Sequence, residues 1–152
     1  MLNLKNIIVP TDFSKVSATE FKYAKDFAEK MGATIHLINV MEKIPPFLQY
    51  GATNSSAAEE AEKAEQKCRE RLEEIAEEIR DDSMLNIIPV FRKGIDYEEI
   101  ISYSKEVKGD MIIIATHGRT GIFHTLLGSV AEKVIRYSNC PVLVISNEEN
   151  ES

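Results

Sequence analysis

Five short apolar runs alternate along the chain with longer segments in which apolar residues recur at helical spacing. The runs are rich in β-branched residues and predict strands at residues 4–9, 33–40, 86–91, 111–114 and 141–145. The first run ends at Pro10. Strands that alternate with helices predict an α/β fold with a parallel sheet covered on both faces.

Four helices are predicted between these strands, at residues 14–31 and 56–80, from Asp96 onward, and from Gly128-Ser129 onward. Ser17 with Glu20, Ser56 with Glu59 and Asp96 with Glu99 have the spacing of capping boxes. The positions expected to face the core are Phe21, Ala24, Phe27, Ala28 and Met31; Ala57, Ala61, Ala64, Cys68, Leu72, Ile75 and Ile79; Ile100, Ile101, Ser104 and Val107; and Val130, Val134 and Ile135.

The charged helix at 56–80 has two interpretations. A helix packed against the sheet with one solvated face is the simpler one, and a coiled-coil or partner-binding helix is the alternative. Pro89 interrupts the third apolar run, and because proline removes a ladder donor, this strand is predicted at the edge of the sheet. With no repeat and no linker, the sequence predicts one domain over residues 1–152, with a long loop at 41–55 and a frayed acidic tail at 146–152.

The net charge of the chain excludes some classes of function. The chain has 152 residues and a formal net charge of −7, which argues against non-specific binding of nucleic acid or of an anionic membrane. No secretory signal and no membrane-length apolar run is recognised, and the two cysteines have no CxxC or zinc spacing. We therefore expect a cytoplasmic protein with reduced cysteines.

The stretch IIIATHGRTGIFHTLLGSV, from Ile112 to Val130, is the candidate binding loop. A strand ends, a glycine-rich loop follows, and a helix opens on Gly128-Ser129, which would present free N–H groups to an anion. Ser129 could add a hydroxyl donor and Arg119 a positive charge. The alternative is that Ser129 with Glu132 merely caps the helix and that the glycines serve turns. Neither a Walker A loop nor GxGxxG is present.

Three parts of the chain together resemble the universal stress protein family. The family signature G-x2-G-x9-G-[ST] matches at Ala115, Gly118, Gly128 and Ser129, with alanine replacing the first glycine. The first strand ends in Pro10-Thr11-Asp12, and the closing run NCPVLVI, from Asn139 to Ile145, is similar to the family's last strand. The resemblance implies a single doubly wound, Rossmann-like domain with strand order 3-2-1-4-5.

The resemblance also implies a nucleotide site. In the nucleotide-binding branch of the family, the position of Val40 holds adenine through its backbone, and that of Asp12 reaches the ribose hydroxyls or a metal-bound water. The implied ligand is ATP, or ADP or AMP, accompanied by Mg2+. The complete set of implied binding residues is Pro10, Thr11, Asp12, Val40, Ile114, Ala115, His117, Gly118, Arg119, Gly128, Ser129 and Val130.

Three functions remain open at this point. A nucleotide-dependent regulatory module, which the family resemblance implies is a homodimer paired through its last strand from Pro141 to Ile145, is the first. A partner-binding stress protein without nucleotide and a slow ATP-hydrolysing enzyme are the alternatives. No nucleophile elbow is present, no paired carboxylates are expected at one site, and Asp12 is the single acid that a motif places there.

Overall fold

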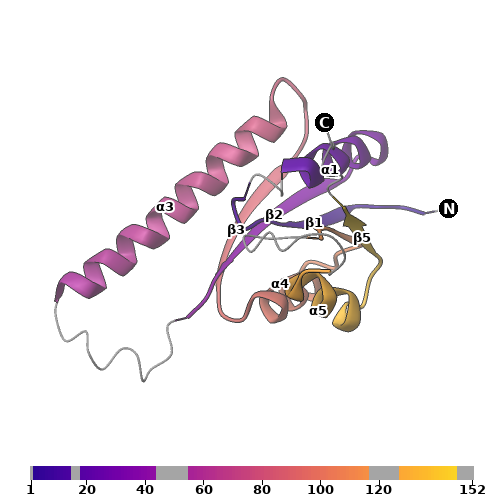
Figure 1. The fold of residues 1–152 in the computed structure, drawn as a ribbon. Helices are drawn as coiled ribbons and strands as arrows, with labels where there is room; N and C mark the ends of the chain where they lie inside the picture. Colours follow the sequence, from indigo (N-terminus) through magenta and orange to yellow (C-terminus); the bar gives the residue numbers. More distant parts are fainter. Residues whose placement is uncertain (1, 15–17, 44–54, 117–126, 147–152) are drawn as a thin grey trace, which may run out of the picture.

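A computed structural model describes residues 2–14, 18–43, 55–116 and 127–146 (Figure 1). Strands and helices alternate through the chain, as the apolar pattern predicts. The elements are β1 (Asn6–Pro10), α1 (Ala18–Met31), β2 (Thr34–Met41), α3 (Ser55–Arg80), β3 (Ile87–Lys93), α4 (Asp96–Glu106), β4 (Met111–Ala115), α5 (Ser129–Tyr137) and β5 (Val142–Ile145).

The five strands form one parallel sheet in the order β3-β2-β1-β4-β5, which confirms the predicted fold class. β1 lies at the centre, where Ile8 pairs with His36 of β2 on one side and with Ile112 of β4 on the other. The predicted edge position of the third strand is also confirmed, because β3 pairs only with β2, with Pro89 opposite Leu37. The strand order reverses between β1 and β4.

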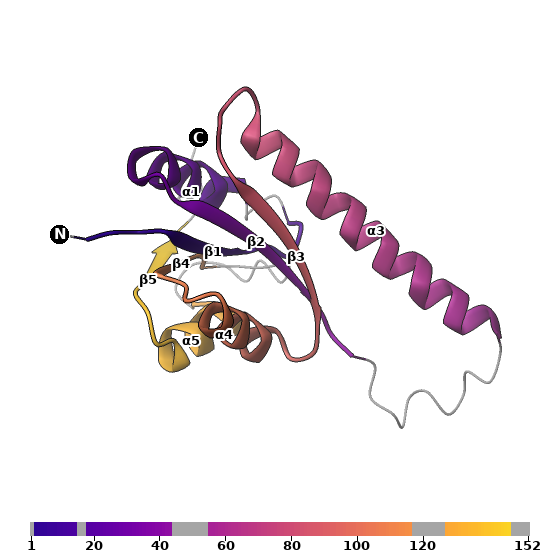
Figure 2. The same cartoon turned by 180° about the vertical axis from the view of Figure 1, so that it is seen from behind.

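Helices cover both faces of the sheet. α1 and α3 lie on one face and α4 and α5 on the other, as the two opposite views show (Figures 1 and 2). Alternate strand residues serve the two layers: Ile7 and Val9 pack in the α1/α3 layer, and Ile8 packs in the α4/α5 layer. Ile112 is fully buried in the second layer. The core therefore consists of two apolar layers separated by a sheet that is buried on both sides.

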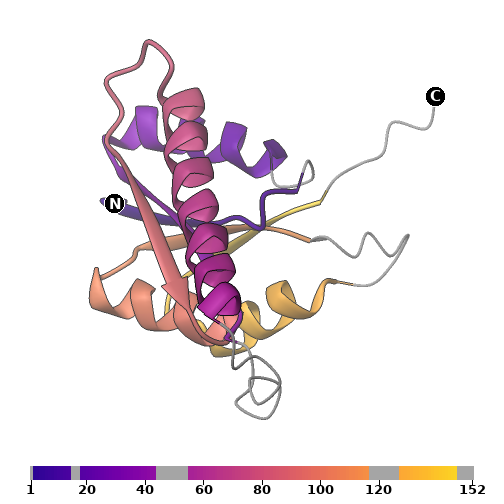
Figure 3. The same ribbon diagram turned by 90° about the vertical axis from the view of Figure 1, so that its left-hand side faces the viewer.

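The long helix α3 stands in front of β3 when the sheet is viewed from this edge (Figure 3), and its buried apolar residues lie in its C-terminal part. Leu72, Ile75 and Ile79 are buried as predicted, whereas Ala61 and Ala64 are exposed. The predicted inward stripe is therefore wrong at Ala61 and Ala64, because the N-terminal half of α3 diverges from the sheet (Figures 1 and 2). In that half, Glu65 still forms an ion pair with Lys93 at the end of β3. Within the described residues, no helix is both long and apolar enough to cross a membrane.

Four further details differ from the sequence predictions. Met31 was expected to face the core but is 41% exposed at the end of α1, and Ser56 was expected to cap α3 but lies inside the helix, which begins at Ser55. Ile135 was expected to face the core but is 44% exposed, because α5 turns Ala131 and Val134 toward the sheet instead. Asp96 is the first residue of α4 rather than its cap, since Ile95 holds the cap position and no side chain caps the helix. These corrections concern the rotation or the ends of a helix, not its existence.

Candidate functional site

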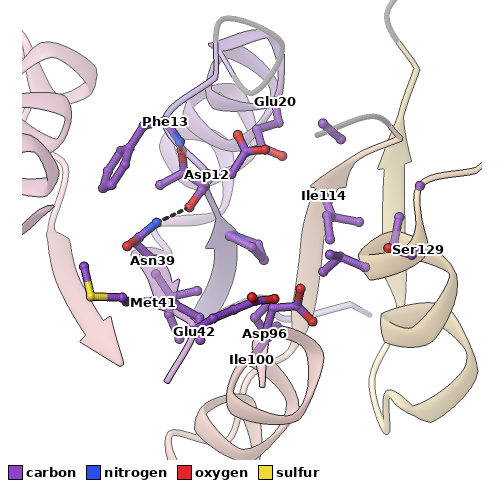
Figure 4. A pocket seen from close by; sticks show the side chains of 18 of the residues that line it. Asp12, Phe13, Glu20, Asn39, Met41, Glu42, Asp96, Ile100, Ile114 and Ser129 are labelled. Atoms are coloured by element: carbon purple, nitrogen blue, oxygen red, sulfur yellow. Dashed lines mark hydrogen bonds between the residues drawn. The ribbon is translucent and has the colours of Figure 1, made fainter. Parts of the chain in front are cut away.

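A pocket of about 500 Å3 opens where the carboxyl ends of the central strands meet the start of α5 (Figure 4). It lies at the point where the strand order reverses, which is where open α/β sheets bind ligands. Its volume is in the range of small-molecule sites. The residues that line it are Pro10, Thr11, Asp12, Phe13, Glu20, Ile38, Asn39, Val40, Met41, Glu42, Cys68, Asp96, Ile100, Ile114, Ala115, Thr116, Gly128, Ser129, Val130 and Ala131.

Backbone hydrogen bonds hold the chain after β1 against the end of β2. The N–H of Thr11 donates to the carbonyl oxygen of Ile38 at 2.8 Å. A second hydrogen bond runs in the opposite direction, from Nδ2 of the buried Asn39 side chain to the carbonyl oxygen of Thr11 at 2.8 Å (Figure 4). Two bonds between Thr11 and β2 therefore fix the backbone just before Asp12, and Oδ1 of Asp12 in turn accepts a hydrogen bond from the N–H of Ser14 at 2.9 Å.

The start of α5 is held against the end of β4. The N–H of Gly128 donates to the carbonyl oxygen of Thr116 at 2.6 Å, and the N–H of Thr116 donates to the carbonyl oxygen of Ile145 at 2.9 Å. Gly128 is the cap residue of α5 and Ser129 is its first helical residue, with no side-chain capping bond. The capping-box interpretation of Ser129 is therefore wrong, and its exposed hydroxyl is left to face the pocket mouth.

The first turn of α5 is suited to an anion. The N–H groups at the start of a helix have no partner inside the helix, and the helix dipole gives this end a partial positive charge. Gly128, Ser129, Val130 and Ala131 all line the pocket. The absence of a Cβ on Gly128 lets a ligand approach the backbone closely at the point where these groups begin.

Four carboxyl groups also line the pocket, contrary to the expectation of no paired acids at one site. Asp12 and Glu20 lie near the end of β1, and Glu42 and Asp96 lie near the end of β2 (Figure 4). In the described part of the lining, no lysine, arginine or histidine balances them. A phosphate group in this pocket therefore needs the dipole of α5, a metal ion or an uncharged acid to offset the repulsion.

Glu20 differs from the other three acids because its side chain is buried, with 1% exposed. Among the described residues, neither of its carboxyl oxygens has a hydrogen-bond partner of normal geometry. The pKa of Glu20 is raised well above its usual value, chiefly by burial and further by the charge of Asp12, while the nearby backbone of Ala115 offsets a smaller part. Ser17, the other member of the capping box expected for Glu20, lies outside the described residues.

Most predicted site residues come together in this pocket. Its lining includes Pro10, Thr11, Asp12, Val40, Ile114, Ala115, Gly128, Ser129 and Val130, while His117, Gly118 and Arg119 lie outside the described residues. The sequence analysis did not place Glu20, Asn39, Glu42 or Asp96 here. One signal for Glu20 was present, since it lies four residues before the buried Ala24 and hence on the same face of α1.

A metal ion would need ligands beyond the side chains of this pocket. Within the described residues, no group of three or more His, Cys, Asp and Glu side chains is arranged to hold one. The pocket fits a nucleotide better than it fits a metal ion alone. It combines backbone groups at the strand ends, apolar side chains such as Val40 and Ile114, and the first turn of α5, which no side chain caps. Phosphate oxygens of a bound nucleotide could complete the coordination of a cation that the protein alone does not hold.

Comparison with known proteins identifies relatives over nearly the full chain. MJ0531 of Methanocaldococcus jannaschii, a universal stress protein, is 33% identical over 97% of this chain and 85% of its own. MJ0577 of the same organism, also a universal stress protein, is 30% identical over 96% of this chain and 97% of its own. The solved structure of MJ0577 has a TM-score of 0.83 and covers 97% of this chain and 99% of that one.

A more distant structure shares the fold. It is a universal stress protein from Archaeoglobus fulgidus, solved in complex with dAMP, with a TM-score of 0.63 and 20% identity over 95% of this chain and 99% of that one. The sequence profile of the Universal stress protein family matches residues 3–146 of this chain. Since this match spans all nine described elements, the chain belongs to the universal stress protein family.

Proposed function

We propose that the protein binds an adenine nucleotide, ATP first among them, in the pocket at the ends of β1, β2 and β4, and acts as a nucleotide-dependent regulatory module. The observation that carries this proposal is the uncapped first turn of α5, which opens into the pocket at Gly128, Ser129 and Val130. The dAMP complex of the Archaeoglobus fulgidus relative supports an adenine nucleotide as the ligand class.

Each part of the pocket has a role in this proposal. Adenine lies against the end of β2, with the backbone of Val40 as its hydrogen-bonding group, and the ribose lies near Asp12. The phosphates lie against the first turn of α5. Gly118, which the family signature also assigns to them, lies outside the described residues. Mg2+, when bound, supplies positive charge to the phosphates, and Asp12 acts on it through a water rather than as a direct ligand.

Ala115 stands where the family signature has its first glycine. It is the last residue of β4, and its extended backbone does not require the left-handed conformations that favour glycine. Its single methyl group lines the pocket without closing it, since about 500 Å3 remain. The alanine is therefore compatible with a bound nucleotide.

The first test is to identify what the protein carries. The protein is purified without added nucleotide and denatured, and any small molecule released is identified by mass spectrometry. We expect ATP, ADP or AMP in the released fraction, or, if the pocket empties during purification, a higher Tm on addition of Mg-ATP. An empty protein whose Tm does not respond to Mg-ATP, ADP or AMP would contradict the proposal and favour a partner-binding role.

A second measurement separates binding from turnover. Steady release of ADP above the background rate, lost in Asp12→Ala, would favour the slow ATP-hydrolysing enzyme instead. The regulatory proposal expects no such release at saturating Mg-ATP, because hydrolysis needs a positioned water and stabilisation of the transferred phosphoryl group, and no arrangement of that kind is seen among the described side chains.

We also propose that the protein is a homodimer paired through β5. This strand is the free edge of the sheet beyond β4, and Val142, Leu143 and Val144 are only half-buried in the single chain. The carbonyl oxygens of Pro141 and Ile145 bond to β4. By the alternation of a strand, the N–H groups of Val142 and Val144 then point away from β4 and are available to a second chain.

Proline substitution tests this pairing. Val144→Pro removes an outward N–H and leaves the bonds between β5 and β4, so it is expected to convert the dimer to a monomer with an unchanged far-UV circular dichroism spectrum. Leu143→Pro is the control that removes an inward N–H and should lower Tm. Sedimentation equilibrium measures the oligomeric state of each variant. A monomeric wild type, or a dimeric Val144→Pro, would contradict pairing through this edge.

A further inference from the structure

Glu20 is the buried group of the pocket that the proposed nucleotide contacts leave unexplained. It belongs to the first turn of α1, lines the pocket, and is 1% exposed. Both carboxyl oxygens of Glu20, and the hydroxyl of Thr116 in the same lining, are buried without a hydrogen-bond partner of normal geometry among the described residues. Polar atoms left in this way are costly, so their retention at a ligand pocket calls for a role.

The surroundings of Glu20 favour its uncharged form. The carboxyl oxygens of Glu20 are not accessible to water. Asp12, which follows β1, is the charged residue whose field acts on Glu20, and its negative charge disfavours a second one nearby. The backbone of Ala115 in β4 acts in the opposite direction, because its hydrogen bonding to the carboxyl group lowers the pKa of Glu20, but by less than burial raises it. Glu42 after β2 and Asp96 of α4 lie toward the other side of the pocket and add no positive charge (Figure 4).

The charge state of Glu20 matters for an anionic ligand. When protonated, the carboxyl group adds no negative charge to a pocket that already has Asp12, Glu42 and Asp96, and its O–H is a hydrogen-bond donor. When ionised, the carboxylate adds a negative charge that water does not screen, close to Ala115 at the end of β4. A carboxyl group kept uncharged by its site is a known way to accept an anion.

We propose that Glu20 is a residue of the phosphate-binding part of the pocket and that it admits the phosphates of the nucleotide only while its carboxyl group carries a proton. The inference rests on the proposed function, since it concerns the same pocket. It adds a proton-linked control: rising pH ionises Glu20 and releases the ligand. A divalent cation held directly by Glu20 is the opposite case, because a cation requires the ionised carboxylate.

The test compares the pH dependence of nucleotide affinity in the wild type and in Glu20→Gln, measured by titration calorimetry with Mg-ATP between about pH 5 and pH 9. Glutamine has nearly the same size and cannot ionise. We expect the wild-type Kd to rise with pH, approaching tenfold per pH unit once Glu20 ionises, and the Glu20→Gln Kd to lack this component. Glu42→Gln, which removes an exposed carboxylate of the same lining, should keep the wild-type slope.

Equal slopes in the wild type and in Glu20→Gln would overturn the inference and leave nucleotide binding intact. Weaker binding by Glu20→Gln at every pH would overturn it in favour of direct metal ligation. If the wild type binds no ATP, ADP or AMP at any of these pH values, the proposed function fails and the inference fails with it. Failure of the proposed function removes nucleotide binding by the wild type at every pH. Failure of the inference about Glu20 leaves that binding in place, so the two outcomes are distinguishable.

The free energy of unfolding supplies a second measurement that needs no ligand. Between the pKa of Glu20 in the unfolded chain and its raised pKa in the folded protein, the folded state holds the extra proton, so the stability due to this group is lost as pH rises. Glu20→Gln should remove this part of the loss. A variant that flattens the stability profile but not the affinity profile would assign Glu20 a structural role only, against the inference.

Discussion

Replacing Ser129 with aspartate is expected to weaken nucleotide binding by about 100-fold while leaving the fold intact. Ser129 is the first residue of α5 and lines the pocket where the phosphates are proposed to lie. Two unit charges about 4 Å apart near a protein surface repel by roughly 4 kcal/mol, and since Ser129 is exposed, we expect only part of this to survive solvent screening. Titration calorimetry with Mg-ATP measures the loss.

The effect on stability should have the opposite sign. An acidic side chain in the first turn of a helix interacts favourably with the helix dipole, so the Tm of Ser129→Asp should match or exceed that of the wild type. Ser129→Asn is the matched control, because asparagine has the size of aspartate without its charge, and its affinity should fall by less than about tenfold. Equal losses in the two variants would mean that no anion binds at this turn.

Replacing Ile112 with alanine is expected to lower the free energy of unfolding by about 3–4 kcal/mol. Ile112 is fully buried in β4, pairs with Ile8 and Val142 on its two sides, and packs in the layer beneath α4 and α5. Removing its methyl groups leaves a cavity that a two-sided sheet cannot close by a local shift. Since small domains are stable by only about 5–15 kcal/mol, urea denaturation will detect the loss clearly.

The control is the same substitution at a position that the sequence pattern assigned wrongly to the core. Ile135→Ala in α5 should cost less than about 1 kcal/mol, because Ile135 is 44% exposed and alanine has the higher helix propensity. The two variants remove the same atoms, so their difference reports burial together with the smaller change in helix propensity at Ile135. Similar losses would mean that Ile135 is covered in solution, as it would be in a larger interface.

The strand and helix order could be read from the sequence because each element has its own short-range signal. Pro89 shows why: a residue without an N–H donor is confined to an edge strand, and β3 is the edge. The ends of β1 and β4 were also predictable as neighbours, since a parallel α/β sheet gathers them at the point where the strand order reverses. The likeness to one family then pointed to the start of α5.

The sequence did not predict how each helix is rotated about its axis or how much of its length contacts the sheet. Val130, Val134 and Ile135 fit one apolar stripe, yet α5 presents Ala131 and Val134 to the sheet, because neighbouring positions on a helix compete for one contact surface. The first half of α3 shows the same limit, since Ala61 and Ala64 have helical periodicity but lie where the helix diverges from the sheet (Figures 1 and 2). Periodicity identifies a face, and only the partner surface decides how much of it is covered.

By itself the sequence determined the α/β class, the family and the loop that opens α5, because these depend on residues close together in the chain or on a spacing within it. Only the tertiary structure decided that Asp12, Glu20, Glu42 and Asp96 share one pocket, and that Glu20 alone among them is buried there. They come from four separate elements or their ends, and the pKa of a carboxyl group depends on the burial and charge that distant segments bring to it.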